Sequence, residues 1–209
     1  MYSTGEIEEL LRSGVESRRF ELKGPGDCDD KPFFATVARA ALAMGNLRDG
    51  GHVVIGIDDT RRTERMPGLQ PAALDSWLAT DAVARRMAVY ADPPLRFAVE
   101  ARSLSSGVDV AVIEVFEFAD IPHLCRKDYP GVLRDGALYV RTRKLPETSE
   151  VPSSLEMRDV LDLATVKSLR AYVETAQRAG LTLTVGKEIQ AGQGSDDAQF
   201  DAEREEGWR

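Results

Sequence analysis

Acidic residues at two places in the sequence have the types and spacing of a metal-dependent phosphodiesterase site. They are Glu16 and Glu21 in the segment GVESRRFELK, and Asp58 and Asp59 at the end of NLRDGGHVVIGIDD. Carboxylate oxygens are preferred ligands of Mg²⁺ and Mn²⁺. Lys23 lies two residues after Glu21, where an ammonium could hold a phosphate beside the metal ion. We therefore treat Glu16, Glu21, Lys23 and Asp58 as candidate catalytic residues and the four acids as candidate metal ligands.

The elements around these residues can be predicted from the pattern of apolar side chains. Ser3 and Glu6 have the spacing of a capping box, which predicts a short helix ending near Gly14. Phe20 and Leu22 then alternate with polar residues, so this run is predicted to be a strand whose polar side chains point one way. The sequence thus places the first acids at a strand and at the turn that enters it.

The rest of the chain alternates between helical and strand-like patterns. Helices are predicted over 31–44, 72–90 and 155–179, and strands over 53–57, 97–104, 108–118 and 139–142. This mixture predicts an α+β (mixed α/β) fold in which helices pack on a mixed sheet. We expect one domain over residues 1–180, including its C-terminal helix, followed by a disordered acidic tail over 187–209.

The two acidic segments and three later ones resemble the Schlafen-type AlbA_2 domain family, which is often labelled DNA-binding. The resemblance rests on the E-S-x-x-x-E-x-K stretch ending at Lys23 and on N-x-x-x-G-G-x-x-x-I-G-x-D-D ending at Asp59. It continues through DPPLRFAV at 92–99, the strand at 108–118 and GALYVR at 136–141. The resemblance implies a single lobe of the AlbA_2 type and, by comparison with Schlafen-like RNases, three acids that converge around Mg or Mn.

The resemblance favours a metal-dependent endonuclease acting on structured RNA such as tRNA, with DNA as the alternative substrate. A second hypothesis is a catalytically silent DNA- or RNA-binding regulatory module. A third is an interaction subunit of a larger, ATPase-containing defence complex, docked through the acidic tail. Larger relatives build a clamp from two lobes, so a homodimer of this chain could restore such a clamp. The alternative for the acids is structural: a solvated strand residue, a turn acid and a polar strand exit.

Basic residues that could contact nucleic acid occur in clusters, although the net charge of the chain is −8. The candidates are Arg18, Arg19, Arg141, Arg143 and Lys144. We interpret Glu21, Arg18 and Arg141 as surface groups. The tail from Lys187 to Arg209 holds seven acidic and three basic residues, so half of the net charge lies there. Such a balance fits a nuclease with a local site better than a protein that grips nucleic acid along its whole surface.

Asn46, Gly50 and Gly51 offer two interpretations. Their backbone N–H groups could hold a phosphate. The alternative, which we favour, is a helix end followed by a turn that needs positive φ angles. No nucleotide-binding glycine motif of the Walker or Rossmann type occurs.

Composition places the chain among soluble proteins of a reducing compartment, and we expect a cytoplasmic location with no membrane contact. The sequence has no apolar run of about 18 residues, and its acidic, helical start is unlike a signal peptide. Its two cysteines are too few for a disulfide scaffold.

Overall fold

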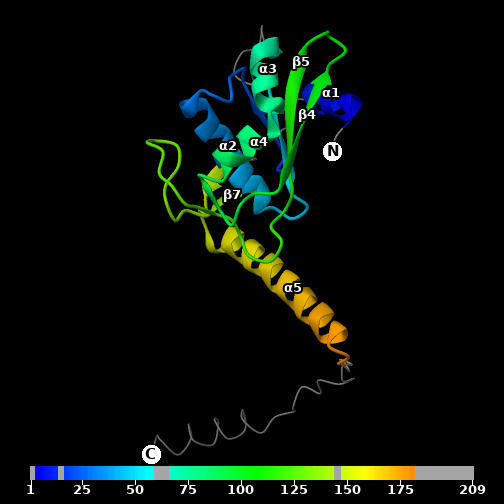
Figure 1. Cartoon of the computed structure of the whole chain (residues 1–209), viewed down its shortest axis with the longest axis vertical. Helices are drawn as coiled ribbons and strands as arrows, with labels where there is room; N and C mark the ends of the chain where they lie inside the picture. The colour runs from blue at the N-terminus through cyan, green and yellow to red at the C-terminus, as the bar shows by residue number, and fades with distance from the viewer. Residues whose placement is uncertain (1–2, 14–16, 59–65, 144–146, 182–209) are drawn as a thin grey trace, which may run out of the picture. The chain divides into compact units, whose positions relative to one another are not determined.

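The computed structural model describes residues 3–13, 17–58, 66–143 and 147–181 (Figure 1). By compactness the chain divides into two units, Met1–Arg170 and Ala171–Arg209, and one helix crosses the boundary between them. Of the second unit the structure describes the end of that helix and the three residues after it. Glu16, Asp59, Lys144 and the tail over 187–209 lie outside the described residues.

A four-stranded mixed sheet forms the centre of the first unit. Its strands are β1 (Phe20–Lys23), β2 (Gly51–Ile55), β4 (Phe97–Ser103) and β5 (Asp109–Val115). They lie in the order β1-β2-β5-β4, with β1 parallel to β2 and the other neighbours antiparallel. The predicted hairpin of 97–104 and 108–118 is confirmed as β4 and β5, and the predicted α+β class is confirmed by the mixture of helices and sheet.

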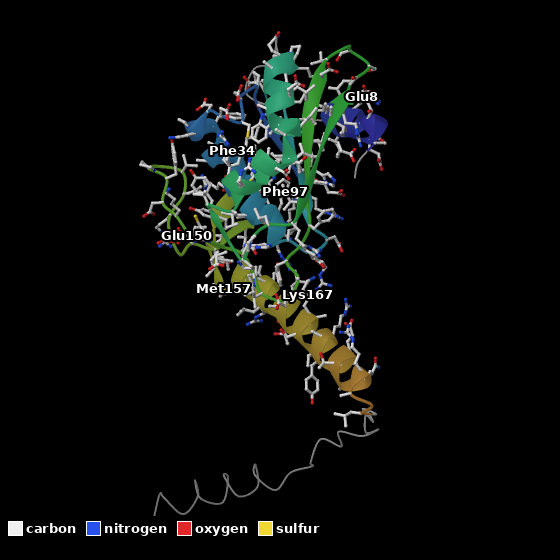
Figure 2. The ribbon with its side chains drawn as sticks, viewed as in Figure 1. Glu8, Phe34, Phe97, Glu150, Met157 and Lys167 are labelled. Carbon is white, nitrogen blue, oxygen red and sulfur yellow. The ribbon has the colours of Figure 1, made fainter. Side chains whose placement is uncertain are left out.

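Helices cover both faces of this sheet. The described helices that lie wholly within the first unit are α1 (Thr4–Ser13), α2 (Lys31–Gly45), α3 (Pro71–Leu78) and α4 (Thr80–Met87). The α2 side of the sheet holds the larger core, in which Phe34 (labelled in Figure 2) and Trp77 stack with ring centroids 5.7 Å apart. On the other face, Ile7 and Leu11 of α1 pack against sheet residues. Figure 1 accordingly shows α3 and α1 on opposite sides of the β4–β5 hairpin.

A local signal in the sequence accounts for the start of α1. The Ser3–Glu6 capping box is present: the Ser3 amide donates to Glu6 Oε2 at 2.7 Å, and the Glu6 amide donates to Ser3 Oγ at 3.3 Å.

The single helix predicted over 72–90 is wrong, because the chain breaks at Ala79, whose ψ of 68° is not helical. This break lets Trp77 enter the core completely while α4 turns Val83 and Met87 inward.

Two short ribbons and a long helix complete the described structure. The ribbons pair β3 (Ala91–Asp92) with β6 (Leu124–Cys125) and β7 (Tyr139–Arg141) with β8 (Thr148–Glu150). The three-residue strand β7 was predicted, whereas β3, β6 and β8 were not. Helix α5 (Ser154–Arg178) matches the predicted helix, and its Val160 and Leu163 pack on Phe118 and Val140. None of the described helices is long and apolar enough to cross a membrane.

Two buried histidines should make folding stability depend on pH. His52 and His123 are 6% and 3% exposed, and burial lowers the pKa of each below its ordinary value of 6.5. Glu114 Oε1, 3.4 Å from His52 Nε2, opposes this shift without reversing it. Below about pH 6.5 the unfolded chain therefore binds more protons than the folded chain, and each histidine can remove up to about 1.4 kcal/mol of stability per pH unit.

We expect the urea midpoint to be constant from pH 8 to pH 7 and to fall from pH 6.5 to pH 5. The double variant His52→Asn/His123→Asn serves as the control, and its midpoint should depend less on pH over this range. An equal slope in the wild type and the double variant would show that other groups cause the effect.

Candidate functional site

The parallel pairing of β1 with β2 brings the ends of the two acidic segments together. The carbonyl of Lys23, the last residue of β1, accepts hydrogen bonds from the amides of Gly56 and Ile57, both at 2.9 Å. Gly56 has a φ of 110°, a conformation that L side chains rarely adopt. Asp58 directly follows Ile57, so the turn after β2 holds Asp58 beside the end of β1.

Glu21 lies at the centre of a buried hydrogen-bond network. Its Oε1 contacts Lys23 Nζ, and its Oε2 accepts from Arg141 Nη1 at 2.5 Å and from Thr148 Oγ1 at 2.8 Å. The residue is only 7% exposed, so our interpretation of Glu21 as a surface group is wrong. Although β1 is an edge strand, Arg141 of β7 and Thr148 of β8 contact the Glu21 side chain and bury it.

Arg141 is also buried, at 1% exposure, and its interpretation as a surface group is wrong as well. Besides Glu21, its guanidinium donates to the carbonyls of Arg18 at 3.1 Å, Ser17 at 3.3 Å and Phe20 at 3.3 Å. Arg18 returns the contact by donating from Nε and Nη2 to the Arg141 carbonyl at 3.1 and 2.8 Å. These bonds tie β7 to the segment that enters β1, 123 residues before Arg141 in the case of Arg18.

A cavity of about 510 Å³ opens beside this network. Its lining includes Glu21 and Lys23 of β1, Arg39 of α2, Arg141 of β7 and Thr148 of β8. The side chain of Lys23 is 24% exposed, so its ammonium can reach a ligand in the cavity. Cations from separate elements thus face the same space next to a buried carboxylate.

Arg39 was missed by the sequence analysis. Its Nη2 donates to the Thr148 carbonyl at 2.9 Å, and its guanidinium lies over the Tyr139 ring, 5.5 Å from the centroid. Its Nε is buried without a hydrogen-bond partner in the described part of the chain. The signal was present in the sequence: Arg39 interrupts a run of alanines and other small apolar residues on a helix that is otherwise mostly buried.

The candidate nucleic-acid-binding arginines are divided between two places. Arg18, Arg141 and Arg143 line a second cavity, of about 240 Å³, against the start of α5. Arg143 donates to both carboxylate oxygens of Asp159, at 2.8 and 2.6 Å, and burial lowers the pKa of Arg18 from its ordinary value. Arg19 lies apart from this cavity and donates to the Asp49 carbonyl at 2.9 Å. The second cavity therefore combines basic and acidic side chains.

Asn46 has a structural role. Its buried amide donates from Nδ2 to the carbonyls of His123 at 2.9 Å and Tyr139 at 3.0 Å, and its Oδ1 accepts from the His123 amide at 2.8 Å. Gly50 has a φ of 68°, and a Cβ there would lie 2.0 Å from the Val115 carbonyl oxygen. Both features support the interpretation of this segment as a helix end followed by a turn, and not as a phosphate-binding backbone.

The described residues test the expected metal site only in part. They contain no group of three or more His, Cys, Asp or Glu that could hold a metal ion, and Glu16 and Asp59 fall outside them. Of the two expected ligands that are described, Glu21 has donors on both oxygens. Lys23 can leave Glu21 and expose Oε1 to a cation, because the lysine stem is flexible and partly exposed.

Taken together, the fold and the site define an α+β domain with a cation-lined cavity at the parallel edge of a mixed sheet. A family model described as "Schlafen, AlbA_2" matches residues 16–147. The chain belongs to this family, which suggests a function related to nucleic acid.

The chain has a distant likeness to a solved structure, that of the DIP2311 protein from Corynebacterium diphtheriae. The sequences are 19% identical, the TM-score is 0.45, and the match covers 70% of this chain. It covers 26% of the other chain, so this chain spans about a quarter of the length of that protein. No curated protein matches the sequence.

Proposed function

We propose that this protein binds a nucleic-acid phosphate in the cavity between β1, α2 and β8 and cleaves RNA there. In its most specific form the proposal is a metal-dependent endoribonuclease that acts on structured RNA such as tRNA. The observation that carries it is the presence of Lys23 and Arg39 in one cavity beside the Glu21 carboxylate. Membership of the Schlafen AlbA_2 family supports the choice of nucleic acid as ligand.

The charged side chains of the proposed site have separate roles. Lys23 moves from Glu21 to the phosphate, where its ammonium balances the charge that develops on the phosphoryl oxygens. Arg39, which is held in place by Thr148 and Tyr139, orients a non-bridging oxygen through its guanidinium. Glu16, Glu21, Asp58 and Asp59 would hold Mg²⁺ or Mn²⁺, an ion that can supply activated water when bound.

A second candidate function is a silent nucleic-acid-binding module. It is favoured by the contacts of Glu21, because a carboxylate that already pairs with a lysine and an arginine serves equally well to keep two cations in place for binding. A third candidate, docking on a larger partner protein through the acidic tail, depends on residues 187–209 outside the described structure.

One experiment separates these candidates: incubation of the purified chain with tRNA, mRNA and single-stranded DNA, with and without Mn²⁺. Cleavage of RNA that requires the metal supports the endoribonuclease. Binding that needs no metal and weakens steeply with salt supports the silent module. Absence of both, with retention of a co-purifying protein, supports the interaction subunit.

Arg39→Ala is expected to weaken RNA binding and to lower the slope of log affinity against log salt by about one unit, which corresponds to one phosphate contact. Fluorescence anisotropy in EDTA at several salt concentrations measures both quantities. Arg85→Ala is the matched control, because Arg85 lies exposed on α4 and does not line this cavity. If the two variants bind RNA equally well, the phosphate lies elsewhere.

A further inference from the structure

Strand β4 is an edge of the main sheet in the described part of the chain. Among the described strands only β5 pairs with it. The Arg96 carbonyl accepts from the Phe116 amide at 3.0 Å, and the Leu104 amide donates to the Val108 carbonyl at 2.9 Å. In an antiparallel ladder the bonded residues alternate, so the even-numbered residues of β4 face β5. The N–H and C=O groups of the odd-numbered residues, Phe97 to Ser103, therefore face the outer edge.

The side chains of this edge carry one charge of each sign. Glu100 and Arg102 lie two residues apart on the same face of the strand and form an ion pair with each other. Arg102 Nη1 also donates at 3.0 Å to the Ala101 carbonyl, one of the groups that face the outer edge. Charges on an edge strand usually prevent pairing with another chain. A strand with one acid and one base, however, is complementary to a second copy of itself turned by 180°.

We infer that two copies of this chain join through β4, in an antiparallel pair centred on Ala101. In this register Glu100 lies opposite Arg102 of the partner subunit, and Arg102 lies opposite the partner's Glu100. Ala101 faces the partner's Ala101, and Val99 faces the partner's Ser103. The odd-numbered residues make the hydrogen bonds between the subunits, which matches the direction of their N–H and C=O groups. The charged residues take the pairs without hydrogen bonds, where opposed side chains lie closest.

Neighbouring registers are unfavourable because they place like charges opposite each other or misalign the backbone hydrogen-bonding groups. Sliding one strand by two residues places Glu100 opposite the partner's Glu100, and sliding it by two in the other direction places Arg102 opposite the partner's Arg102. Like charges directly opposite each other destabilise a strand pair. A slide by one residue turns the outward N–H and C=O groups out of register. The charge pattern therefore selects one alignment.

This assembly goes beyond the function proposed for the cavity and does not depend on it. It joins two four-stranded sheets into one of eight strands, with a β1 at each end. Seven strand spacings separate the two β1 strands, a distance of about 34 Å before twist. The two cavities would then lie at opposite ends of one continuous sheet.

The test measures the mass of the full-length chain by sedimentation velocity as a function of concentration. The wild type should form a dimer, and Glu100→Arg and Arg102→Glu should each raise the dimer dissociation constant by about tenfold or more. Mixing the two single variants should restore a dimer, because each then supplies the charges that the other lacks. Glu9→Arg, a charge reversal at an exposed position of α1, is the control and should leave the dimer unchanged.

A wild-type chain that stays monomeric at about 100 μM would overturn the inference, as would a dimer that neither charge reversal weakens or two variants that fail to associate when mixed. Binding of RNA by the same samples gives an independent readout. The dimer can therefore fail while the cavity still binds RNA, and the cavity can fail while the dimer persists.

Discussion

Arg141→Met is expected to cost about 3–5 kcal/mol of folding stability, because it leaves the buried Glu21 carboxylate without its arginine partner. The guanidinium is 1% exposed and donates to Glu21 and to three backbone carbonyls. Methionine has a similar length but no donor, so these acceptors would lose their bonds without gaining water. Urea unfolding followed by circular dichroism measures the change.

Two further variants separate the ion pair from general damage to the site. Arg143→Met is the matched control: Arg143 lies two residues later, is exposed, and pairs with Asp159, so its loss should cost less than about 1 kcal/mol. Glu21→Gln combined with Arg141→Met should recover part of the lost stability, since no unpaired charge then remains buried. If Arg141→Met were as stable as Arg143→Met, Arg141 would not be the residue that holds β7 to the segment entering β1.

Glu21→Gln is expected to reduce metal-dependent RNA cleavage by on the order of 100-fold or more, if the proposed function is correct. Glutamine keeps an oxygen that can accept from Arg141 and Thr148, so the fold should tolerate it better than alanine. The variant loses one negative charge beside the phosphate, and its affinity for RNA should be unchanged or higher. Initial cleavage rates in Mn²⁺ and anisotropy in EDTA measure the two effects.

Glu147→Gln provides the matched control, because Glu147 lines the same cavity but is exposed. It should retain most of the cleavage activity. Equal residual cleavage by the wild type and Glu21→Gln would indicate a contaminant or another site. The silent binding module would then be the better account of this protein.

The sequence predicted those parts of the fold that depend on local patterns. The capping box at Ser3 and Glu6 and the strands from Phe97 to Val115 have the expected form. The break at Ala79 escaped prediction because both halves of the segment are helical in pattern, and only the burial of Trp77 makes the break favourable. Local periodicity therefore identified the elements but not every boundary.

The candidate site was predicted in its residue types and not in its surroundings. The contact between Glu21 and Lys23 follows from their spacing along one strand, which places both side chains on the same face. The burial of Glu21 depends on Arg141 and Thr148, more than a hundred residues later, and no pattern within β1 reports on them. The convergence of Glu16, Glu21, Asp58 and Asp59 stays a prediction, because Glu16 and Asp59 are outside the described residues.

The contacts of Thr148 determine where the C-terminal boundary of a truncated domain can lie. The family match ends at residue 147, yet the next residue donates its hydroxyl to Glu21 and offers its carbonyl to Arg39. Beyond it, Val160 and Leu163 cover Phe118 and Val140, next to the strand residue Arg141. An excised or transplanted copy that stops at the family boundary would lose a wall of its own cavity. An isolated domain that keeps this cavity must extend through at least the first three turns of α5.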